Sequence, residues 1–114
     1  MSSWNKNKYG AKKVDYKGYT FDSIAECNRY KELELLERAG KIKALDRQVS
    51  FLLIPKQEDE YAVKYKADFK YVENGKLVVE EVKSSATAKD KTYVIKRKLF
   101  KFYYQDAIFR EIIS

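Results

Sequence analysis

Two acidic residues and a lysine lie on the paired strands of a predicted β-hairpin. The hairpin is predicted by Asn74-Gly75, a strong signal for a two-residue turn that sets how the two strands pair. Counting outward from this turn places Asp68 directly opposite Glu81, on the same face of the sheet. The same count places Lys66 opposite Lys83. Because side chains alternate along a strand, Lys83 should project beside Glu81.

The chemistry that this pattern favours is binding of a hard divalent cation. Directly opposed carboxylates repel each other, and Mg²⁺ or Mn²⁺, which prefer oxygen ligands, would turn that repulsion into coordination. The alternative is structural, with the two acids neutralised on an exposed strand surface by Lys66, Lys70 and Lys83. An acid followed by Glu-x-Lys also arises by chance in a chain with 36% charged residues. Both interpretations stay open at this point.

A third carboxylate, Glu26, lies near the start of a predicted helix over Ser23–Ala39, with Gly40 where a C-cap glycine belongs. Glu26 and Arg29 interrupt the apolar stripe of this helix, so both should face the sheet. Glu26 could therefore approach the metal site. The segment Ser23-Ile24-Ala25-Glu26 is equally a capping-box pattern, and the two roles are compatible.

The remaining patterns predict an α/β (α+β) fold with a mixed sheet. Strands are expected over residues 48–54, 63–71, 77–83 and 107–113, and a second helix from Asp90 to about Gln105. The order is therefore α-β-β-β-α-β, with an additional hairpin expected between Val14 and Phe21. Residues 1–20 are assigned to a basic N-terminal arm or hairpin and residues 21–114 to a single domain, since 114 residues support one core.

Hydrophobic alternation predicts which faces are buried. The strand before Pro55 is expected to be buried because it is rich in large apolar residues. The next strand should have one apolar face, made of Val63, Tyr65, Ala67, Phe69 and Tyr71. The second helix should have an apolar side made of Ile95, Leu99, Phe102 and Tyr103.

The charge balance favours a polyanionic partner. Lysine and arginine outnumber aspartate and glutamate by 24 to 17, a formal charge of +7, which favours nucleic acid through counterion release. A merely basic soluble protein is the alternative. Phosphate contacts are predicted for Lys12, Lys13, Lys96, Arg97, Lys98 and Lys101. Lys96 lies in the apolar arc of its helix and could instead extend its ammonium group to solvent as ordinary packing. Gln48 is expected near the metal site.

The amino acids that are scarce exclude other chemistries. The chain has no histidine, which excludes Ser-His-Asp and Cys-His hydrolysis, histidine-based zinc sites and a histidine general base. The single cysteine, Cys27, cannot form an intramolecular disulfide, so a reducing cytoplasm is expected. No apolar run approaches the roughly 20 residues that span a bilayer, and membrane insertion is not expected.

These residues resemble the PD-(D/E)XK nuclease superfamily. The likeness lies in Glu26 on a first helix, Asp68 on the second core strand, Glu81-Val82-Lys83 on the third, and a following basic helix. The whole chain more closely resembles a family of small phage-encoded proteins of that superfamily whose role is poorly defined. That likeness runs from Lys8-Tyr9-Gly10 through Phe21-Asp22-Ser23-Ile24-Ala25-Glu26 and Arg29-Tyr30 to Lys96-Arg97-Lys98.

The resemblance implies a three-layer restriction-endonuclease-like core and Mg²⁺-dependent hydrolysis of DNA. It implies that Asp68 and Glu81 bind metal together with the Val82 carbonyl and that Glu26 supports a ligand or metal-bound water. It also implies that Lys83 orients and helps to deprotonate the attacking water while countering charge on the transition state. Ala67 stands where the nominal motif has proline, which makes the match less specific.

The function expected from the sequence is a metal-dependent endodeoxyribonuclease. Branched or junction DNA in phage replication or recombination is the substrate that some relatives suggest, and a homodimer would suit it. The first alternative is a catalytically inactive DNA-binding module of the same fold. The second is an interaction protein that does not bind DNA and whose charge is incidental.

Overall fold

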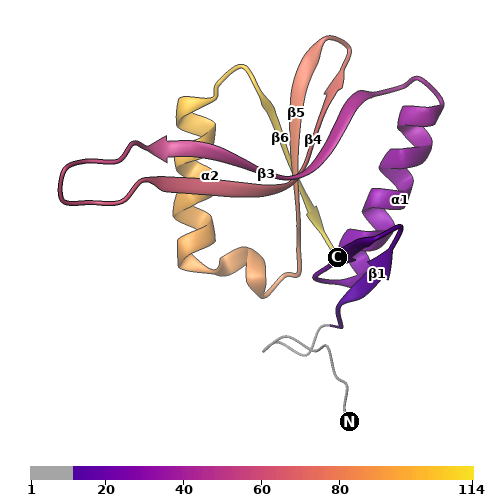
Figure 1. The fold of residues 1–114 in the computed structure, drawn as a ribbon, viewed down its shortest axis with the longest axis horizontal. Coiled ribbons are helices and arrows are strands. Elements are labelled where there is room, and N and C mark those ends of the chain that lie inside the picture. Colours follow the sequence, from indigo (N-terminus) through magenta and orange to yellow (C-terminus); the bar gives the residue numbers. More distant parts are fainter. Residues whose placement is uncertain (1–11) are drawn as a thin grey trace.

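The computed structural model describes residues 12–114, which form one four-stranded sheet, a small hairpin and two long helices (Figure 1). The predicted α-β-β-β-α-β order is confirmed, and the additional hairpin between Val14 and Phe21 is present. The first eleven residues of the expected basic arm lie outside the described part. The elements are β1 (Val14–Tyr16), β2 (Tyr19–Phe21), α1 (Ile24–Arg38), β3 (Lys43–Ile54), β4 (Val63–Glu73), β5 (Lys76–Lys83), the short 3₁₀ helix η1 (Thr87–Lys89), α2 (Lys91–Tyr103) and β6 (Ile108–Ile113).

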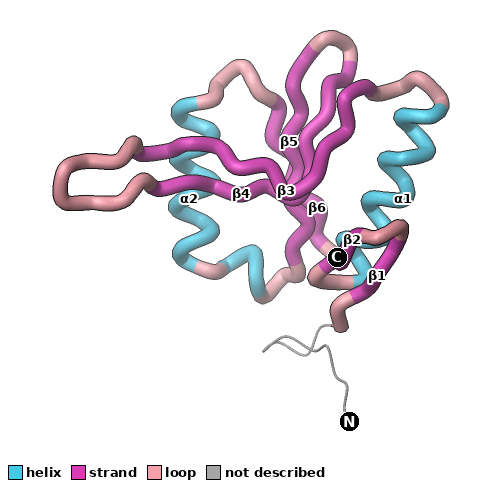
Figure 2. Tube along the Cα trace, viewed as in Figure 1, coloured by secondary structure: helices cyan, strands magenta, loops and turns pink. Residues whose placement is uncertain are grey.

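The sheet is mixed and has a helix on each side. Its strand order is β3-β4-β5-β6, with antiparallel pairing except between β5 and β6, which are parallel. Figure 2 shows α1 and α2 on different sides of the strands. Consecutive residues of β5 confirm this arrangement, because Val78 packs in the cluster with α1 and Val79 in the cluster with α2. The layers are therefore α1, sheet and α2.

Local signals set the ends of these elements as predicted. The Ser23 hydroxyl caps α1 by accepting a hydrogen bond from the Glu26 N–H at 3.0 Å. Asn74 and Gly75 have φ values of 53° and 77°, and Glu73 pairs with Lys76 on either side of this turn. Positive φ at both central residues is the requirement of a type I′ hairpin turn.

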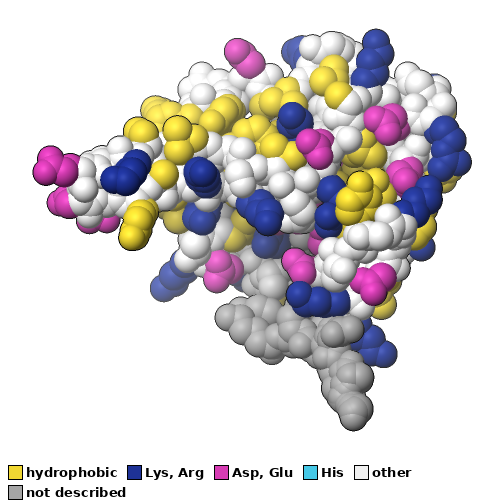
Figure 3. Space-filling model, viewed as in Figure 1, with side chains coloured by type: hydrophobic (Ala, Val, Ile, Leu, Met, Phe, Trp, Pro, Cys, Tyr) yellow, Lys and Arg dark blue, Asp and Glu magenta, His cyan; other side chains and the backbone are white. Residues whose placement is uncertain are grey.

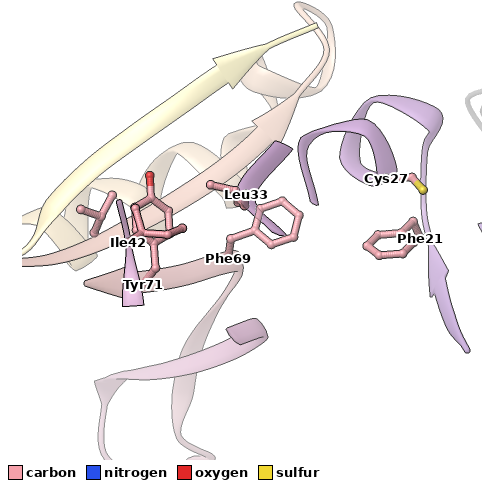
Figure 4. Packing of buried hydrophobic residues seen from close by; sticks show 7 residues of the cluster. Phe21, Cys27, Leu33, Ile42, Phe69 and Tyr71 are labelled. Atoms are coloured by element: carbon pink, nitrogen blue, oxygen red, sulfur yellow. The ribbon is translucent and has the colours of Figure 1, made fainter. Parts of the chain in front are cut away.

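Strand β4 changes the face that it buries. Tyr65 and Ala67 pack in the α2 cluster, whereas Phe69 and Tyr71 pack in the α1 cluster, shown from close by in Figure 4. The prediction of one apolar face along this strand is therefore wrong. All four residues have odd numbers, so a flat strand would direct them to one side. The face of the sheet toward which these side chains point therefore reverses around Asp68.

The reversal coincides with an irregularity in the neighbouring strand. Gln48 of β3 has a φ of 55°, a left-handed conformation that is uncommon for a residue with a Cβ atom. On β3 too, Leu45 packs with the α1 cluster while Phe51 and Leu53 pack with the α2 cluster. The outer halves of β3 and β4 consequently leave the rest of the sheet and extend across α2 (Figure 1).

Two predictions of burial are wrong. Strand β3 begins at Lys43 rather than near Gln48, and only Leu53 in it is buried, because β3 is the edge strand of the sheet. Helix α2 buries Tyr93 and Phe100, which fill the space beneath the sheet, and leaves most of the expected apolar side in solvent. The exposed fractions are 53% for Ile95, 64% for Phe102 and 54% for Tyr103. Among residues 12–114, neither helix has the length and apolar character that crossing a membrane requires.

Candidate active site

The candidate site lies where strands β4 and β5 separate. Their ladder ends at the pair Phe69 and Glu80. Beyond this pair β4 continues along β3, whereas β5 continues along β6. Asp68 and Glu81 are the first residues past the separation, one on each strand. We refer to this position as the fork.

The predicted register holds as far as the fork and then fails. Asp68 and Glu81 do not form a ladder pair, and Lys66 pairs with Ser50 of β3 rather than with Lys83. The reason is that each strand has a second neighbour that draws it away from the other. The two carboxyl groups are nevertheless close enough to interact, since the charge of Asp68 raises the pKa of Glu81 and a side-chain hydrogen bond with Glu81 opposes the effect of burial on the pKa of Asp68.

The Asp68 carboxylate joins the two sides of the fork. Its Oδ2 accepts a hydrogen bond from the Val82 N–H at 2.8 Å, an interaction that replaces a missing ladder bond. Its Oδ1 lies 3.4 Å from the Gln48 side-chain nitrogen, which donates to it. Asp68 is thus held from both β5 and β3. The group of Val82 that contacts this carboxylate is its N–H, whereas the resemblance implicates the Val82 carbonyl in metal binding.

Glu81 is buried, with only 5% of its surface exposed. The Tyr65 hydroxyl donates a hydrogen bond to Glu81 Oε1, and Lys83 Nζ lies 3.4 Å from Oε2. The Lys83 ammonium also lies 4.6 Å from the centre of the Tyr93 ring on α2, a cation–π contact. Lys83 is therefore fixed beside the acid pair, as its spacing from Glu81 predicted.

Glu26 takes part in capping α1 and also lies next to the site, where its contact with Asp68 runs through Gln48. Its Oε1 accepts a hydrogen bond at 3.3 Å from the N–H of Asp22, just before the helix cap, so it completes the capping of α1. Its Oε2 accepts at 2.9 Å from the Gln48 amide, which also contacts Asp68. Glu26 is 4% exposed. Gln48 therefore links Glu26 to Asp68.

Burial raises the pKa values of all three acids. Loss of solvent, with the neighbouring Asp68 charge as a second cause, raises the pKa of Glu81 to about 8 and that of Glu26 to about 7. Loss of solvent also raises the pKa of Asp68, against the opposing effects of the Val82 N–H and Lys83. Ionising these acids together is therefore unfavourable unless a bound cation offsets their charge.

The donor atoms fit Mg²⁺ or Mn²⁺, with two carboxylates as the basis. Both ions prefer oxygen ligands, and Mg²⁺ is commonly held by one or two carboxylates. Within residues 12–114, no group of three or more histidine, cysteine, aspartate or glutamate side chains is arranged to hold a metal. Glu26 is separated from Asp68 by the Gln48 amide. The metal-binding set that these residues support is Asp68 with Glu81.

The residue beside Glu81 has a different role that the sequence did not reveal. Glu80 is fully buried on the α1 side and accepts hydrogen bonds from Arg29 Nε at 2.8 Å and Nη2 at 2.7 Å. The Tyr71 hydroxyl also donates to it. Such a charge-assisted, fully bonded group is a structural ion pair. Arg29 on an apolar stripe was the sequence signal that a buried acid should exist.

Arg47 is a second residue that sequence reasoning missed. Its guanidinium carbon lies 4.9 Å and 4.5 Å from the ring centres of Tyr19 and Phe21, and its Nη2 donates to the Thr20 carbonyl at 3.2 Å. The same Nη2 lies 3.9 Å from Glu26 Oε2. Arg47 therefore ties the β1–β2 hairpin to the edge of the site. Nothing in its local sequence indicated this.

The residues predicted to contact phosphates differ in their surroundings. Arg97 donates to Glu111 at 3.3 Å and Lys13 lies 3.6 Å from Asp22, so both already have an acidic partner. Lys96 is half-buried. The predicted residues with exposed side chains are Lys12, Lys13, Lys98 and Lys101.

A family model described as "Protein of unknown function (DUF1064)" matches residues 6–113. The chain belongs to the DUF1064 family. The family description assigns no activity, and the search of curated proteins found no matching relative.

One solved structure is similar in part. It is described as the crystal structure of SSO0001, with 21% sequence identity and a TM-score of 0.38. The match covers 77% of this chain and 46% of that protein, so the chain spans about half of its length. At this level of likeness, no function can be carried over.

Proposed function

We propose that this protein is a metal-dependent endonuclease that hydrolyses phosphodiester bonds in DNA. The observation that carries the proposal is the pair of half-buried Asp68 and buried Glu81 at the fork, with Lys83 Nζ 3.4 Å from the Glu81 carboxylate. Stability alone does not explain two repelling acids in a position that removes them from water. The formal charge of +7 favours a polyanionic substrate. The resemblance to the PD-(D/E)XK superfamily points to the same residues.

Asp68 and Glu81 would hold the Mg²⁺ ion. When bound, Mg²⁺ stabilises the negative charge that develops on phosphate oxygens during hydrolysis. The Val82 N–H and the Gln48 amide fix the orientation of Asp68, while Tyr65 fixes Glu81. A site held in this way needs little rearrangement when the substrate binds.

Lys83 is the residue that we assign to the reacting phosphate. Its ammonium group is held between Glu81 and the Tyr93 ring, beside the acid pair. From this position it can orient a water molecule and counter the charge of the transition state. Glu26 acts as a positioning residue, since its contact with Asp68 runs through Gln48.

The test is Mg²⁺-dependent nicking of supercoiled plasmid DNA. We expect Asp68→Asn to lower the rate by at least about 100-fold, as loss of a group that stabilises transition-state charge typically does. Asp106→Asn, in the exposed turn between α2 and β6, is the matched control and should cleave like the wild type. Circular dichroism should show that both variants fold. Equal cleavage by wild type and Asp68→Asn would exclude this site.

An inactive DNA-binding module of the same fold is the second candidate. The observation that favours it is that only two acids, rather than three, converge at the fork among residues 12–114. It predicts DNA binding with no nicking in Mg²⁺ or Mn²⁺.

We propose branched DNA as a substrate and a homodimer as the form of the protein that cleaves it. The nicking assay should therefore compare linear duplex, single strands, flaps, four-way junctions and RNA. A reducing cytoplasm is the proposed location, because Cys27 is a free, buried thiol.

A further inference from the structure

The outer halves of β3 and β4 form a two-stranded ribbon, residues 49–67, that extends away from the fork (Figure 1). One side of this β3–β4 ribbon is covered, because Phe51, Leu53, Tyr65 and Ala67 pack in the cluster with α2. Side chains alternate along a strand, so the residues between them point to the other side. Among residues 12–114, no helix packs against that outer side.

The outer side of the β3–β4 ribbon has exposed lysines. Lys64 and Lys66 are both exposed, opposite Leu52 and Ser50 of β3, and Leu52 is itself 46% exposed. Among the side chains of residues 12–114, no acid forms a salt bridge with either lysine. Figure 3 shows basic side chains along this part of the surface and acidic ones at its far end. The positive charge of Lys64 and Lys66 is therefore available to a partner.

These lysines form a series that leads to the candidate active site. Lys64, Lys66 and Asp68 occupy alternate positions of one strand, about 7 Å apart. Lys64 is thus roughly 13 Å from Asp68 along β4, which corresponds to about four base pairs of a DNA helix axis. The side chains of β4 change direction at Asp68, so a duplex that follows the stem of the ribbon up to the fork would pass both ammonium groups before it reaches the acid pair.

We infer that the outer face of the β3–β4 ribbon binds the sugar-phosphate backbone of double-stranded DNA beside the bond to be cleaved. The inference rests on the proposed nuclease function and identifies the surface that holds its substrate. A two-stranded β-ribbon has the dimensions to lie in the major groove, where its lysines contact phosphates of the groove edges.

The tip of the ribbon limits where the DNA lies. Its loop contains Glu58, Asp59 and Glu60, all exposed, and these repel phosphates. The duplex therefore contacts the stem between this acidic tip and the fork, and does not extend beyond the tip. A partner of this shape and charge distribution is distinct from an acidic protein surface, which would have no groove for the ribbon.

The experiment compares two double variants that each remove two positive charges. Lys64→Gln/Lys66→Gln changes the ribbon, whereas Lys41→Gln/Lys76→Gln changes exposed lysines near two turns outside the ribbon. Affinity for a labelled DNA duplex is measured in EDTA by fluorescence anisotropy over a range of salt concentrations. Urea unfolding verifies that both variants retain their stability.

We expect the ribbon variant to reduce the slope of log affinity against log salt by about 1.8, because each lost phosphate contact contributes about 0.9. The same change predicts roughly 60-fold weaker binding at about 0.1 M salt. The control variant should keep the wild-type slope. Lys64→Arg/Lys66→Arg, which retains both charges, should also keep it.

An unchanged slope in the ribbon variant would overturn the inference, as would an equal reduction in both glutamine variants. Preferential loss of binding to RNA, or to an acidic protein, without a change for duplex DNA would overturn it too. Binding in EDTA does not require cleavage, so the two proposals fail separately. A protein that binds through the ribbon but never nicks DNA refutes only the nuclease, whereas nicking without ribbon-dependent binding refutes only the surface.

Discussion

Replacing Glu81 with glutamine should stabilise the metal-free protein at alkaline pH. Burial raises the pKa of Glu81 from 4.5 to about 8, so the folded protein holds this proton more tightly than the unfolded chain does. The stability that the protonated group contributes is complete below about pH 4.5 and is lost as the pH rises through about 8. Glutamine has the same shape and no charge, so it avoids this loss.

The expected change in unfolding free energy follows from the shift in the pKa of Glu81. Between the two pKa values folding takes up one proton, and stability falls by about 1.4 kcal/mol for each pH unit. From about pH 5 to about pH 8, the unfolding free energy of Glu81→Gln should therefore rise by about 4 kcal/mol relative to the wild type. The amide retains an oxygen for the Tyr65 hydroxyl but removes the partner of Lys83, a cost of about 1 kcal/mol that is present at either pH.

Urea unfolding in EDTA at a series of pH values measures this difference. The matched control is Asp59→Asn, an exposed loop acid that should follow the wild-type pH dependence. A difference between Glu81→Gln and wild type that is constant with pH would refute the reasoning, because it would mean that Glu81 ionises in the folded protein as it does in water.

Three further predictions concern the surroundings of the site. Mg²⁺ at about ten times its dissociation constant should stabilise the wild type by about 1.4 kcal/mol, a rise in Tm of several degrees, and Asp68→Asn should show no such rise by calorimetry. Arg29→Met should cost about 3 to 5 kcal/mol in urea unfolding because it leaves Glu80 buried without a partner, and adding Glu80→Gln should recover most of the loss. Tyr65→Phe removes the hydrogen bond that favours the charged form of Glu81, so the midpoint of the pH–rate profile for nicking should move upward by about one unit. A larger loss in the Arg29 and Glu80 double variant than in Arg29→Met, or an unmoved midpoint in Tyr65→Phe, would contradict these assignments.

Features of the fold that depend on a few adjacent residues could be predicted from the sequence. The cap at Ser23, the cap at Asp90 and the Asn74-Gly75 turn are each determined by local hydrogen bonds and backbone angles. The Asn74-Gly75 turn also determined the pairing of the nearest residues of β4 and β5. This is why Asp68, Glu81 and Lys83 could be associated before the structure was known.

The fork itself could not be predicted, because it depends on contacts distant in the sequence. Strand β5 separates from β4 to follow β6, which comes from the end of the chain. The left-handed Gln48 that accompanies the change of face has no glycine or asparagine signal. A residue count from the turn assumes a regular ladder, so it paired Lys66 with Lys83 incorrectly.

The faces of α2 were predicted wrongly for a different reason. Apolar and aromatic residues occur all around this helix, so periodicity alone does not identify the buried side. Packing selects Tyr93 and Phe100, which leaves Ile95 and Phe102 exposed. The buried ion pair between Arg29 and Glu80 was not predicted, although an arginine on an otherwise apolar helix stripe is a signal that a buried acid faces it.

The central claim is that Asp68 and Glu81 share one divalent cation. It is tested most directly by a crystal structure of the protein grown with Mn²⁺, using the anomalous signal of the metal. We predict an anomalous peak within bonding distance of carboxylate oxygens from both residues, and its loss in Asp68→Asn crystals. A peak bound only elsewhere, or no peak at the fork with Mn²⁺ in excess, would contradict the claim.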